Sequence, residues 1–258
     1  MNRKSLCLST HFVGVYAERV CECGAAKTRP SLIFKGKSQK GADVILYPLV
    51  HSFMKFEAVE HRSSPPSNFL ERRIKDTLSV GEGIYGFADR IERAANLIVE
   101  AIETGNKLLL CGNGGSAAEA QHMAAEYVSS LRNENIRRSL PAVALTTDTS
   151  FLTATGNDYG FEKVFERQIE SLGITGDVLI AISTSGSSQN VMLAIQKAKE
   201  RGLKVIGLTG KTGGKMGALV DILLNVPSDE TMRIQEWHMF IDHTIVELVE
   251  YKLFGFIA

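Results

Sequence analysis

The chain has 258 residues, of which 44% are hydrophobic and 22% are charged, a composition typical of soluble globular proteins. Its 29 basic and 29 acidic residues balance, so we expect no nucleic-acid or membrane partner drawn by overall charge. No segment approaches the ~18 uninterrupted apolar residues that a membrane-spanning helix needs. The four cysteines form no disulfide framework, which favours a reducing compartment, and we therefore expect a cytoplasmic protein.

Residues 1–66 differ in composition from the rest of the chain. They contain ten Lys or Arg against five Asp or Glu, and three of the four Cys. They show no sustained helical or alternating pattern of apolar residues, and the segment SSPPSN at 63–68 marks their end. We expect residues 1–66 to be an atypical, poorly ordered N-terminal extension and residues 67–258 to form the folded domain.

From Ser67 onward the apolar residues recur at regular spacing. They first predict two amphipathic helices, the second ending at Gly105. Short apolar runs then alternate with helical segments, at residues 107–112, 141–146, 177–183, 204–210 and 221–227. Such runs suit strands buried on both faces of a parallel sheet. We predict an α/β fold, a doubly wound αβα sandwich with a five-stranded parallel sheet, closed by a long helix from about 230 to 253.

Two loops rich in glycine or hydroxyl residues follow predicted strands. CGNGGS (111–116) lets the backbone approach an anion closely, although a tight turn with a helix N-cap would explain it equally well. STSGSS (183–188) carries five hydroxyls in six residues before a helix, more than one N-cap requires. Because ligands of such folds bind at the carboxyl ends of the strands, two such loops suggest a phosphorylated small molecule.

Several polar residues could carry chemistry. In HMAAE, His122 and Glu126 lie four residues apart on one helix face, where they could bind a metal, exchange protons, or form an ordinary His–Glu pair. In RIQEWHMFIDH, Gln235 and His243 lie roughly 80° and ~12 Å apart on the last helix, so spacing alone does not bring them together. We expect His238, on the same helix, to be a core residue.

The segment TGNDYGFEKVF (155–165) is predicted to be a loop. Its Asn157 and Asp158 lie between two glycines, a composition that simple turn chemistry explains. The same amide and carboxylate could instead contact the hydroxyls of a polyol.

Together these segments resemble the phosphoheptose isomerases, enzymes of the sugar isomerase (SIS) fold. The resemblance runs from about residue 68 to 253 and includes CGNGGS, HMAAE, GNDYGF, GDVLIAISTSGSSQNV, LTGKTGGKM and RIQEWHMFIDH in order. It implies isomerisation of D-sedoheptulose 7-phosphate to D-glycero-D-manno-heptose 7-phosphate, a step in making bacterial heptose for the lipopolysaccharide core or another surface polysaccharide.

The resemblance also assigns roles to single residues. The phosphate would bind Ser183, Thr184, Ser185 and Ser188, and the sugar would contact Asn113, Gly114, Gly115, Asn157 and Asp158. One zinc per subunit would be held by His122, Glu126, Gln235 and His243, with Glu126 and Gln235 also contacting the sugar. Glu126 and His243 would transfer protons. The family is a homotetramer with active sites at subunit interfaces, so the last helix need not meet the first site helix within one chain.

Two other functions compete with this one. A neighbouring branch of the fold binds the replication initiator DnaA and shares the glycine loop and the RIQE signature. That branch lacks the carboxylate at the position of Glu126 and the histidine at the position of His243, and this chain has both. The other alternative is an isomerase of a different sugar phosphate, because loop contacts set that choice within one fold.

Overall fold

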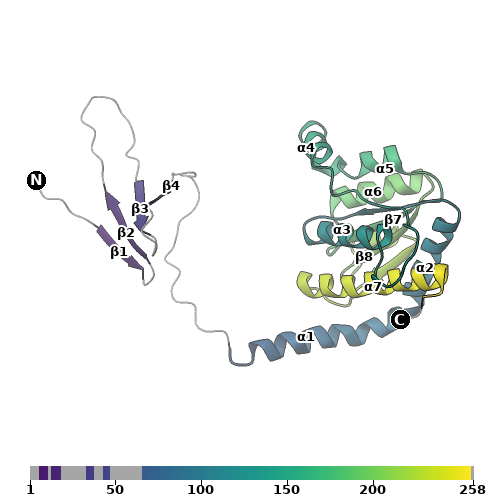
Figure 1. Ribbon diagram of the computed structural model, residues 1–258, viewed down its shortest axis with the longest axis horizontal. Coiled ribbons are helices and arrows are strands. Elements are labelled where there is room, and N and C mark those ends of the chain that lie inside the picture. The colour runs from purple at the N-terminus through teal and green to yellow at the C-terminus, as the bar shows by residue number, and fades with distance from the viewer. Residues whose placement is uncertain (1–5, 11–12, 19–32, 38–42, 47–65, 257–258) are drawn as a thin grey trace, which may run out of the picture. The chain divides into compact units, whose positions relative to one another are not determined.

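The computed structural model describes residues 6–10, 13–18, 33–37, 43–46 and 66–256 (Figure 1). The chain divides into two units, Met1–Pro65 and Pro66–Ala258. In the first unit, strands β1 (Leu6–Thr10), β2 (Val13–Glu18), β3 (Ile33–Lys37) and β4 (Asp43–Leu46) pair antiparallel in that order. The sequence did not predict these strands, because segments of four to six residues are too short for a sustained pattern. The poor order expected for this segment concerns mainly residues outside the described ones and stays a prediction.

The second unit is an α/β domain. Its helices are α1 (Phe69–Ile84), α2 (Ala88–Glu103), α3 (Gly115–Val128), α4 (Thr149–Asp158), α5 (Glu166–Leu172), α6 (Gln189–Glu200) and α7 (Thr231–Phe254). Its strands are β5 (Leu108–Cys111), β6 (Ala142–Ala144), β7 (Val178–Ser183), β8 (Lys204–Thr209) and β9 (Ile222–Asn225). All neighbours pair in parallel, in the order β6-β5-β7-β8-β9. The predicted five-stranded parallel sheet, the two preceding helices and the long last helix are therefore confirmed.

The apolar runs form strands that are buried on both faces of the sheet. Leu108 and Leu110 pack on one face with α2, α3 and α7, while Leu109 and Cys111 pack on the other with α5 and α6. Successive side chains of a strand point to opposite faces, so a continuous apolar run fills both cores. Figure 1 shows the resulting layers, with α5 and α6 on one side of the sheet and α2 and α7 on the other.

The carboxyl ends of three adjacent strands bring three loops to one edge of the sheet. β5 and β7 are in register at Cys111 and Ala181, and β7 and β8 at Ser183 and Thr209. The loop after β8 binds the loop after β7, because the Gly210 N–H donates to the Thr184 carbonyl oxygen over 2.9 Å. The glycine-rich and hydroxyl-rich segments predicted to follow strands thus do so, on neighbouring strands.

Helix α1 leaves an apolar face uncovered. Leu70, Ile74 and Leu78 are 74%, 60% and 62% exposed, and in Figure 1 part of this helix projects beyond the α/β body. Trp237 of α7 anchors it by donating from its indole nitrogen to the Thr77 carbonyl oxygen over 3.1 Å. Among the described residues, no helix combines the length and apolarity needed to cross a membrane.

Candidate active site

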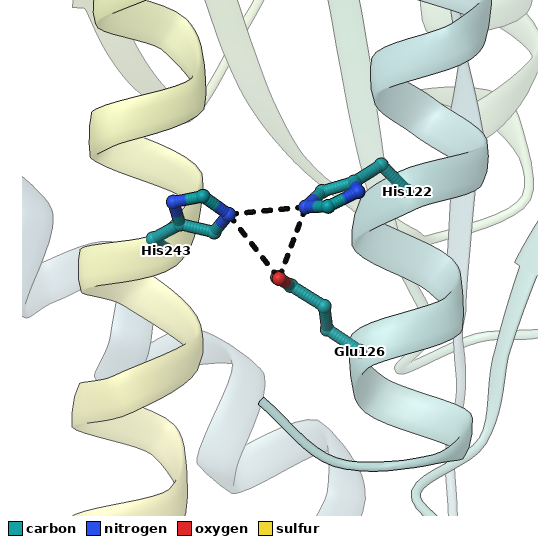
Figure 2. A group of neighbouring side chains, drawn as sticks. All are labelled: His122, Glu126 and His243. Atoms are coloured by element: carbon teal, nitrogen blue, oxygen red, sulfur yellow. Dashed lines mark hydrogen bonds and ion pairs between the residues drawn. The ribbon is translucent and has the colours of Figure 1, made fainter. Parts of the chain in front are cut away.

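Three side chains from two helices converge at one point (Figure 2). His122 and Glu126 come from α3 and His243 comes from α7. The Nε2 atom of His122 lies 3.0 Å from Oε1 of Glu126 and 3.0 Å from Nε2 of His243, and His243 Nε2 lies 3.2 Å from the same Oε1. We call these residues the three-donor cluster. It forms within one chain, so the last helix does meet the first site helix without a second subunit.

Burial differs among the three side chains. The His122 and His243 side chains are 47% and 44% exposed, whereas the Glu126 side chain between them is 12% exposed. Burial raises the pKa of the Glu126 carboxyl, and the neighbouring His243 and His122 rings oppose that rise. The second carboxylate oxygen, Oε2, is buried and has no hydrogen-bond partner. The cluster therefore has an open side formed by imidazoles and a closed side formed by a carboxylate.

The three donor atoms fit a metal ion. Two ligands at the usual 2.0–2.1 Å from a tetrahedral zinc lie about 3.3 Å apart, close to the separations in the cluster. The unprotonated forms of two imidazole nitrogens and a carboxylate oxygen are all electron-pair donors, so without a proton or a cation they repel at 3 Å. All three ligand atoms lie within 4.8 Å of one another. The arrangement can therefore hold a divalent cation.

The glycine turn before α3 lets this helix begin close to α7. Gly114 has φ +57°, a conformation that L side chains rarely adopt. A Cβ atom on Gly115 would collide with the side-chain amide of Gln235, so glycine permits the close approach of these two elements. Gln235 thus lies against the first turn of α3, and no hydrogen bond among the described residues joins its side chain to the three-donor cluster.

The hydroxyls after β7 gather as the sequence predicts. Ser183 Oγ lies 3.0 Å from Ser188 Oγ and 3.4 Å from Ser185 Oγ. Ser188 is the N-cap residue of α6, and its side chain makes no capping hydrogen bond. Free N–H groups at such a helix start, together with hydroxyls, form a neutral anion site. The loop after β8 supports this segment, since a Cβ on Gly186 would collide with the Gly213 carbonyl oxygen.

Asn113 is already paired in the folded chain. Its amide donates to Asn190 Oδ1 and accepts from Asn190 Nδ2, each over 2.8 Å. Asn190 is 5% exposed and lies in the first turn of α6. Asn113 was expected to contact the sugar, whereas nothing in the sequence singled out Asn190. The amide pair links the glycine turn to the hydroxyl loop.

The prediction of a loop at 155–165 was wrong for residues 155–158, which belong to a helix. Asn157 and Asp158 are the last residues of α4, which begins after an N-cap in which Asp148 accepts from the Phe151 N–H. Asn157 donates to Asp158 over 2.7 Å, and among the described residues neither side chain hydrogen-bonds to another predicted site residue. In Figure 1, α4 lies on the opposite side of the domain from α7. Local helix capping outweighed the turn tendency of the Gly-Asn-Asp sequence.

A second group of ionisable residues, which we call the buried cluster, lies between the same two helices. It consists of Glu119 of α3 and His238 and Asp242 of α7, which are 4%, 0% and 0% exposed. His238 Nε2 lies 3.0 Å from the Thr209 carbonyl oxygen, and Nδ1 lies 3.5 Å from Glu119 Oε1. The core position predicted for His238 is confirmed, whereas the two acids were not predicted to be part of a cluster.

Burial governs the ionisation of this cluster. It raises the pKa of Glu119 to about 7, partly offset by a hydrogen bond with Asp242. Burial and the Glu119 carboxylate raise the pKa of Asp242 well above its ordinary range, and burial lowers the pKa of His238. A spacing signal was available: Glu119 precedes Glu126 by two helical turns, and Asp242 follows His238 by one.

Gln121, for which the sequence offered no role, has a structural one. Its side-chain nitrogen donates to Thr146 Oγ1 over 3.2 Å. That hydroxyl in turn donates to the Ala117 carbonyl oxygen over 3.3 Å. Gln121 therefore ties α3 to the loop that follows β6.

Comparisons with known proteins first give the class of the domain. A family model described as “SIS domain” matches residues 82–210, from the end of α1 to the end of β8. The chain therefore has a SIS domain, in agreement with the parallel sheet and the loops at its carboxyl edge.

Named relatives then define the particular family. The phosphoheptose isomerase of Aliarcobacter butzleri is 53% identical over 175 residues, covering 68% of this chain and 92% of that protein. The phosphoheptose isomerase of Geotalea uraniireducens is 54% identical over 187 residues, covering 72% and 98%. A solved structure of phosphoheptose isomerase from Neisseria gonorrhoeae is 44% identical, with a TM-score of 0.66, and covers 70% of this chain and 96% of that one. The chain belongs to the phosphoheptose isomerase family.

Proposed function

We propose that this protein isomerises D-sedoheptulose 7-phosphate to D-glycero-D-manno-heptose 7-phosphate. The observation that carries the proposal is the convergence of His122, Glu126 and His243 within one chain. It occurs in a chain about half identical to proteins named phosphoheptose isomerase. A carboxylate beside imidazoles suits a reaction that moves protons between adjacent carbons and oxygens.

The loops at the sheet edge supply the substrate contacts in this proposal. The hydroxyls and N–H groups of the 183–188 loop hold the phosphate at Ser183, Thr184, Ser185 and Ser188. The glycine turn lies along the sugar at Asn113, Gly114 and Gly115, with Gln235 against it. Asn157 and Asp158 are assigned to the sugar on the family resemblance alone.

We propose one zinc per subunit, bound by His122, Glu126 and His243; Gln235 is assigned as the fourth ligand on the family resemblance alone. Nitrogen and oxygen donors at separations near 3 Å suit zinc better than calcium or magnesium, which prefer sets of oxygen ligands. When bound, zinc would orient the sugar oxygens and stabilise negative charge that develops on them.

The protein's own residues move the protons. Glu126 removes a proton from C1 of the open-chain ketose while His243 gives one to O2, which leaves an enediol. Return of a proton from Glu126 to C2, and transfer of the O1 proton to His243, complete the aldose. The two exposed imidazoles leave the cluster reachable from one side, as an open-chain sugar requires.

The full chain should convert sedoheptulose 7-phosphate to the heptose aldose, followed by NMR of the sugar carbons. Glu126→Gln should lower kcat by about 10²–10⁴-fold while leaving sugar-phosphate binding largely intact. Glu134→Gln, which alters an exposed glutamate, is the matched control and should be as active as the wild type. A fully active Glu126→Gln variant would overturn the proposed role, and an inactive wild type with and without added zinc would overturn the function.

We also propose a homotetramer with active sites near its interfaces. An apolar groove of about 810 Å³ lies between α1, α2 and α7, lined by Leu78, Ile84, Trp237, Phe240 and Leu248 among others. It continues into the uncovered face of α1, and monomeric proteins rarely expose apolar patches of this extent. Light scattering on the full chain should give four subunits, and Leu78→Asp should dissociate them; a monomeric wild type would refute the assembly.

We propose that the isomerase domain spans residues 67–258, preceded by an N-terminal extension, and that the enzyme acts in the cytoplasm in making heptose for a surface polysaccharide. A chain lacking residues 1–66 should keep the activity of the full chain. An inactive full-length protein that binds DnaA in a pull-down would instead favour the alternative of a replication regulator.

A further inference from the structure

A buried arginine lies directly behind the three-donor cluster. Arg137 follows α3 in the chain, and its side chain is 0% exposed. Its guanidinium donates to the backbone carbonyl oxygen of Glu126 over 2.7 Å and to that of Tyr127 over 3.0 Å. These carbonyls belong to the last turn of α3, where oxygens lack helical partners and a positive charge is favourable.

The partner of this arginine lies on the other site helix. Arg137 Nε donates to Glu250 Oε1 of α7 over 2.7 Å. Glu250 is 1% exposed and also accepts from the Leu131 N–H over 3.2 Å and from Asn135 Nδ2 over 3.0 Å. Burial alone would raise the pKa of Glu250, but the hydrogen bonds from Asn135 and Arg137 outweigh it and lower that pKa. Both charges are therefore fully paired.

The ion pair connects the two helices that carry the cluster. On α3 it holds the backbone of Glu126 itself, and on α7 Glu250 lies seven residues, or two turns, after His243 on the same face. The other contacts between these helices include apolar core residues, such as Ala120, Ala124, Ile241 and Ile245, and the buried cluster, in which His238 Nδ1 lies 3.5 Å from Glu119 Oε1. Apolar packing is not directional, whereas a buried guanidinium with several fixed acceptors is.

We propose that the Arg137–Glu250 ion pair is a positioning pair that sets the separation of α3 and α7, and thereby the geometry of the three-donor cluster. Metal ligands and proton-transferring groups tolerate errors of only about 0.5 Å, so a pair that fixes the backbone of Glu126 relative to α7 acts on both. The inference rests on the proposed function for its kinetic readout and on the three-donor cluster for its metal readout.

A double variant tests this pair without leaving a buried charge alone. Arg137→Met with Glu250→Met replaces both partners by apolar groups of similar length, an exchange that proteins often tolerate. The matched control is Lys107→Met with Asp177→Met. It removes a pair in which Lys107 Nζ lies 2.6 Å from a fully buried Asp177, at the start of β5 and β7 and so at the opposite edge of the sheet.

Three quantities are measured on the full chain: the thermal midpoint, zinc affinity by competition with a chromophoric chelator, and kcat and KM for sedoheptulose 7-phosphate. The Arg137/Glu250 double variant should bind zinc at least tenfold more weakly and lose at least tenfold in kcat, with KM within threefold because the phosphate loop is untouched. The Lys107/Asp177 control should lose thermal stability but keep zinc affinity and kcat within twofold.

A third variant separates charge from geometry. Arg137→Lys keeps the positive charge beside Glu250 but has no planar fork to reach the carbonyls of Glu126 and Tyr127 as well. It should remain folded, with zinc affinity and kcat between those of the wild type and the double variant.

Defined results overturn the proposal. Zinc affinity and kcat within twofold of the wild type in the Arg137/Glu250 double variant would do so, as would equal losses in the Lys107/Asp177 control. If the double variant does not fold, Arg137→Lys decides, and wild-type values of zinc affinity and kcat in that variant overturn the positioning role. A wild type that binds zinc but converts no sugar refutes the proposed function alone, and the zinc arm then decides the positioning role. A wild type that does neither overturns both.

Discussion

The three-donor cluster and the buried cluster use the same kinds of residue on the same two helices. Each combines histidine and carboxylate side chains from α3 and α7, and the two groups come within three residues of each other on α3 and within one on α7. They differ in access to solvent. The histidines of the first are nearly half exposed, whereas the second is closed on all sides.

That difference in exposure changes what the same chemistry can do. Its exposure to solvent makes the three-donor cluster accessible to a cation or a sugar, and its three donor atoms point at one another. In the second cluster, His238 donates to the Thr209 carbonyl oxygen, and the carboxyl groups of Glu119 and Asp242 are buried against each other. Burial favours the neutral, protonated form of a carboxyl group. We therefore expect the buried cluster to make the free energy of unfolding depend on pH.

The largest effect should come from a substitution in the three-donor cluster. His243→Ala removes one of the three converging donors, and no neighbouring side chain among the described residues takes the place of the lost imidazole nitrogen. Zinc affinity should therefore fall at least 100-fold, and kcat by a similar factor. The thermal midpoint of the metal-free protein should change little, since the ring is 44% exposed. Chelator competition and calorimetry measure both; a variant that unfolds without metal would contradict the assignment of this cluster to function.

Next in size is a pH effect on stability from the buried cluster. Glu119 holds its proton with a pKa of about 7 in the folded chain against 4.5 in the unfolded chain, so unfolding releases a proton between these values. The free energy of unfolding should therefore fall as pH rises from about 4.5 to 7, by an order of 3 kcal/mol, and level off above. Asp242, whose pKa is also raised, adds in the same direction.

Glu119→Gln should flatten that pH dependence and make the chain more stable than the wild type at pH 8. Urea unfolding at pH 4.5, 6, 7 and 8 measures it, with Glu134→Gln as a control that keeps the wild-type slope. An unchanged slope in Glu119→Gln would mean that this residue does not carry the buried proton.

A smaller loss is expected from His238→Leu. The apolar replacement leaves the Thr209 carbonyl oxygen without its donor in the core, which should cost about 2 kcal/mol of unfolding free energy. Zinc affinity of the folded fraction should stay within threefold of the wild type, because His238 is not one of the converging donors. A loss of zinc binding as large as that of His243→Ala would merge the two clusters into one functional unit.

The smallest effect should come from Gln121→Ala on the exposed side of α3. Its hydrogen bond to Thr146 is solvent-accessible, so the loss should be about 0.5 kcal/mol, with kcat within twofold of the wild type. Urea unfolding and the isomerase assay check it. A tenfold fall in kcat would show that the tie from α3 to the loop after β6 matters for the reaction.

Much of the fold was predictable because strands that are buried on both faces require continuous runs of apolar residues, which the sequence shows directly. Continuous apolar runs placed all five strands of the parallel sheet to within about two residues, and the i, i+4 spacing placed His122 beside Glu126. These are local patterns with a fixed period. The same locality explains the error at Asn157 and Asp158, where the Asp148 N-cap decides for a helix that begins eight residues before Asn157.

The parts of the site that the sequence did not predict depend on contacts between segments that are far apart in the chain. No spacing within α7 could bring His243 to Glu126, because that contact depends on the packing of α7 against α3. Arg137 and Glu250 each resemble ordinary surface residues in the sequence, and only their burial together makes them a pair. Glu119 and Asp242 carried a helical spacing, but one that is equally common on solvated faces.

The contact between His122 and His243 spans 121 positions of the chain, and four of the five strands of the sheet are made between them. During synthesis, His122 and Glu126 of α3 are therefore made long before His243 of α7, and nearly the whole domain is synthesised in between. A nascent or truncated product that ends between α6 and α7 has the 183–188 loop but lacks His243. If the proposed site is correct, isomerase activity in a refolding or translation experiment should appear only when α7 docks. The time at which activity appears would then report the last step of folding.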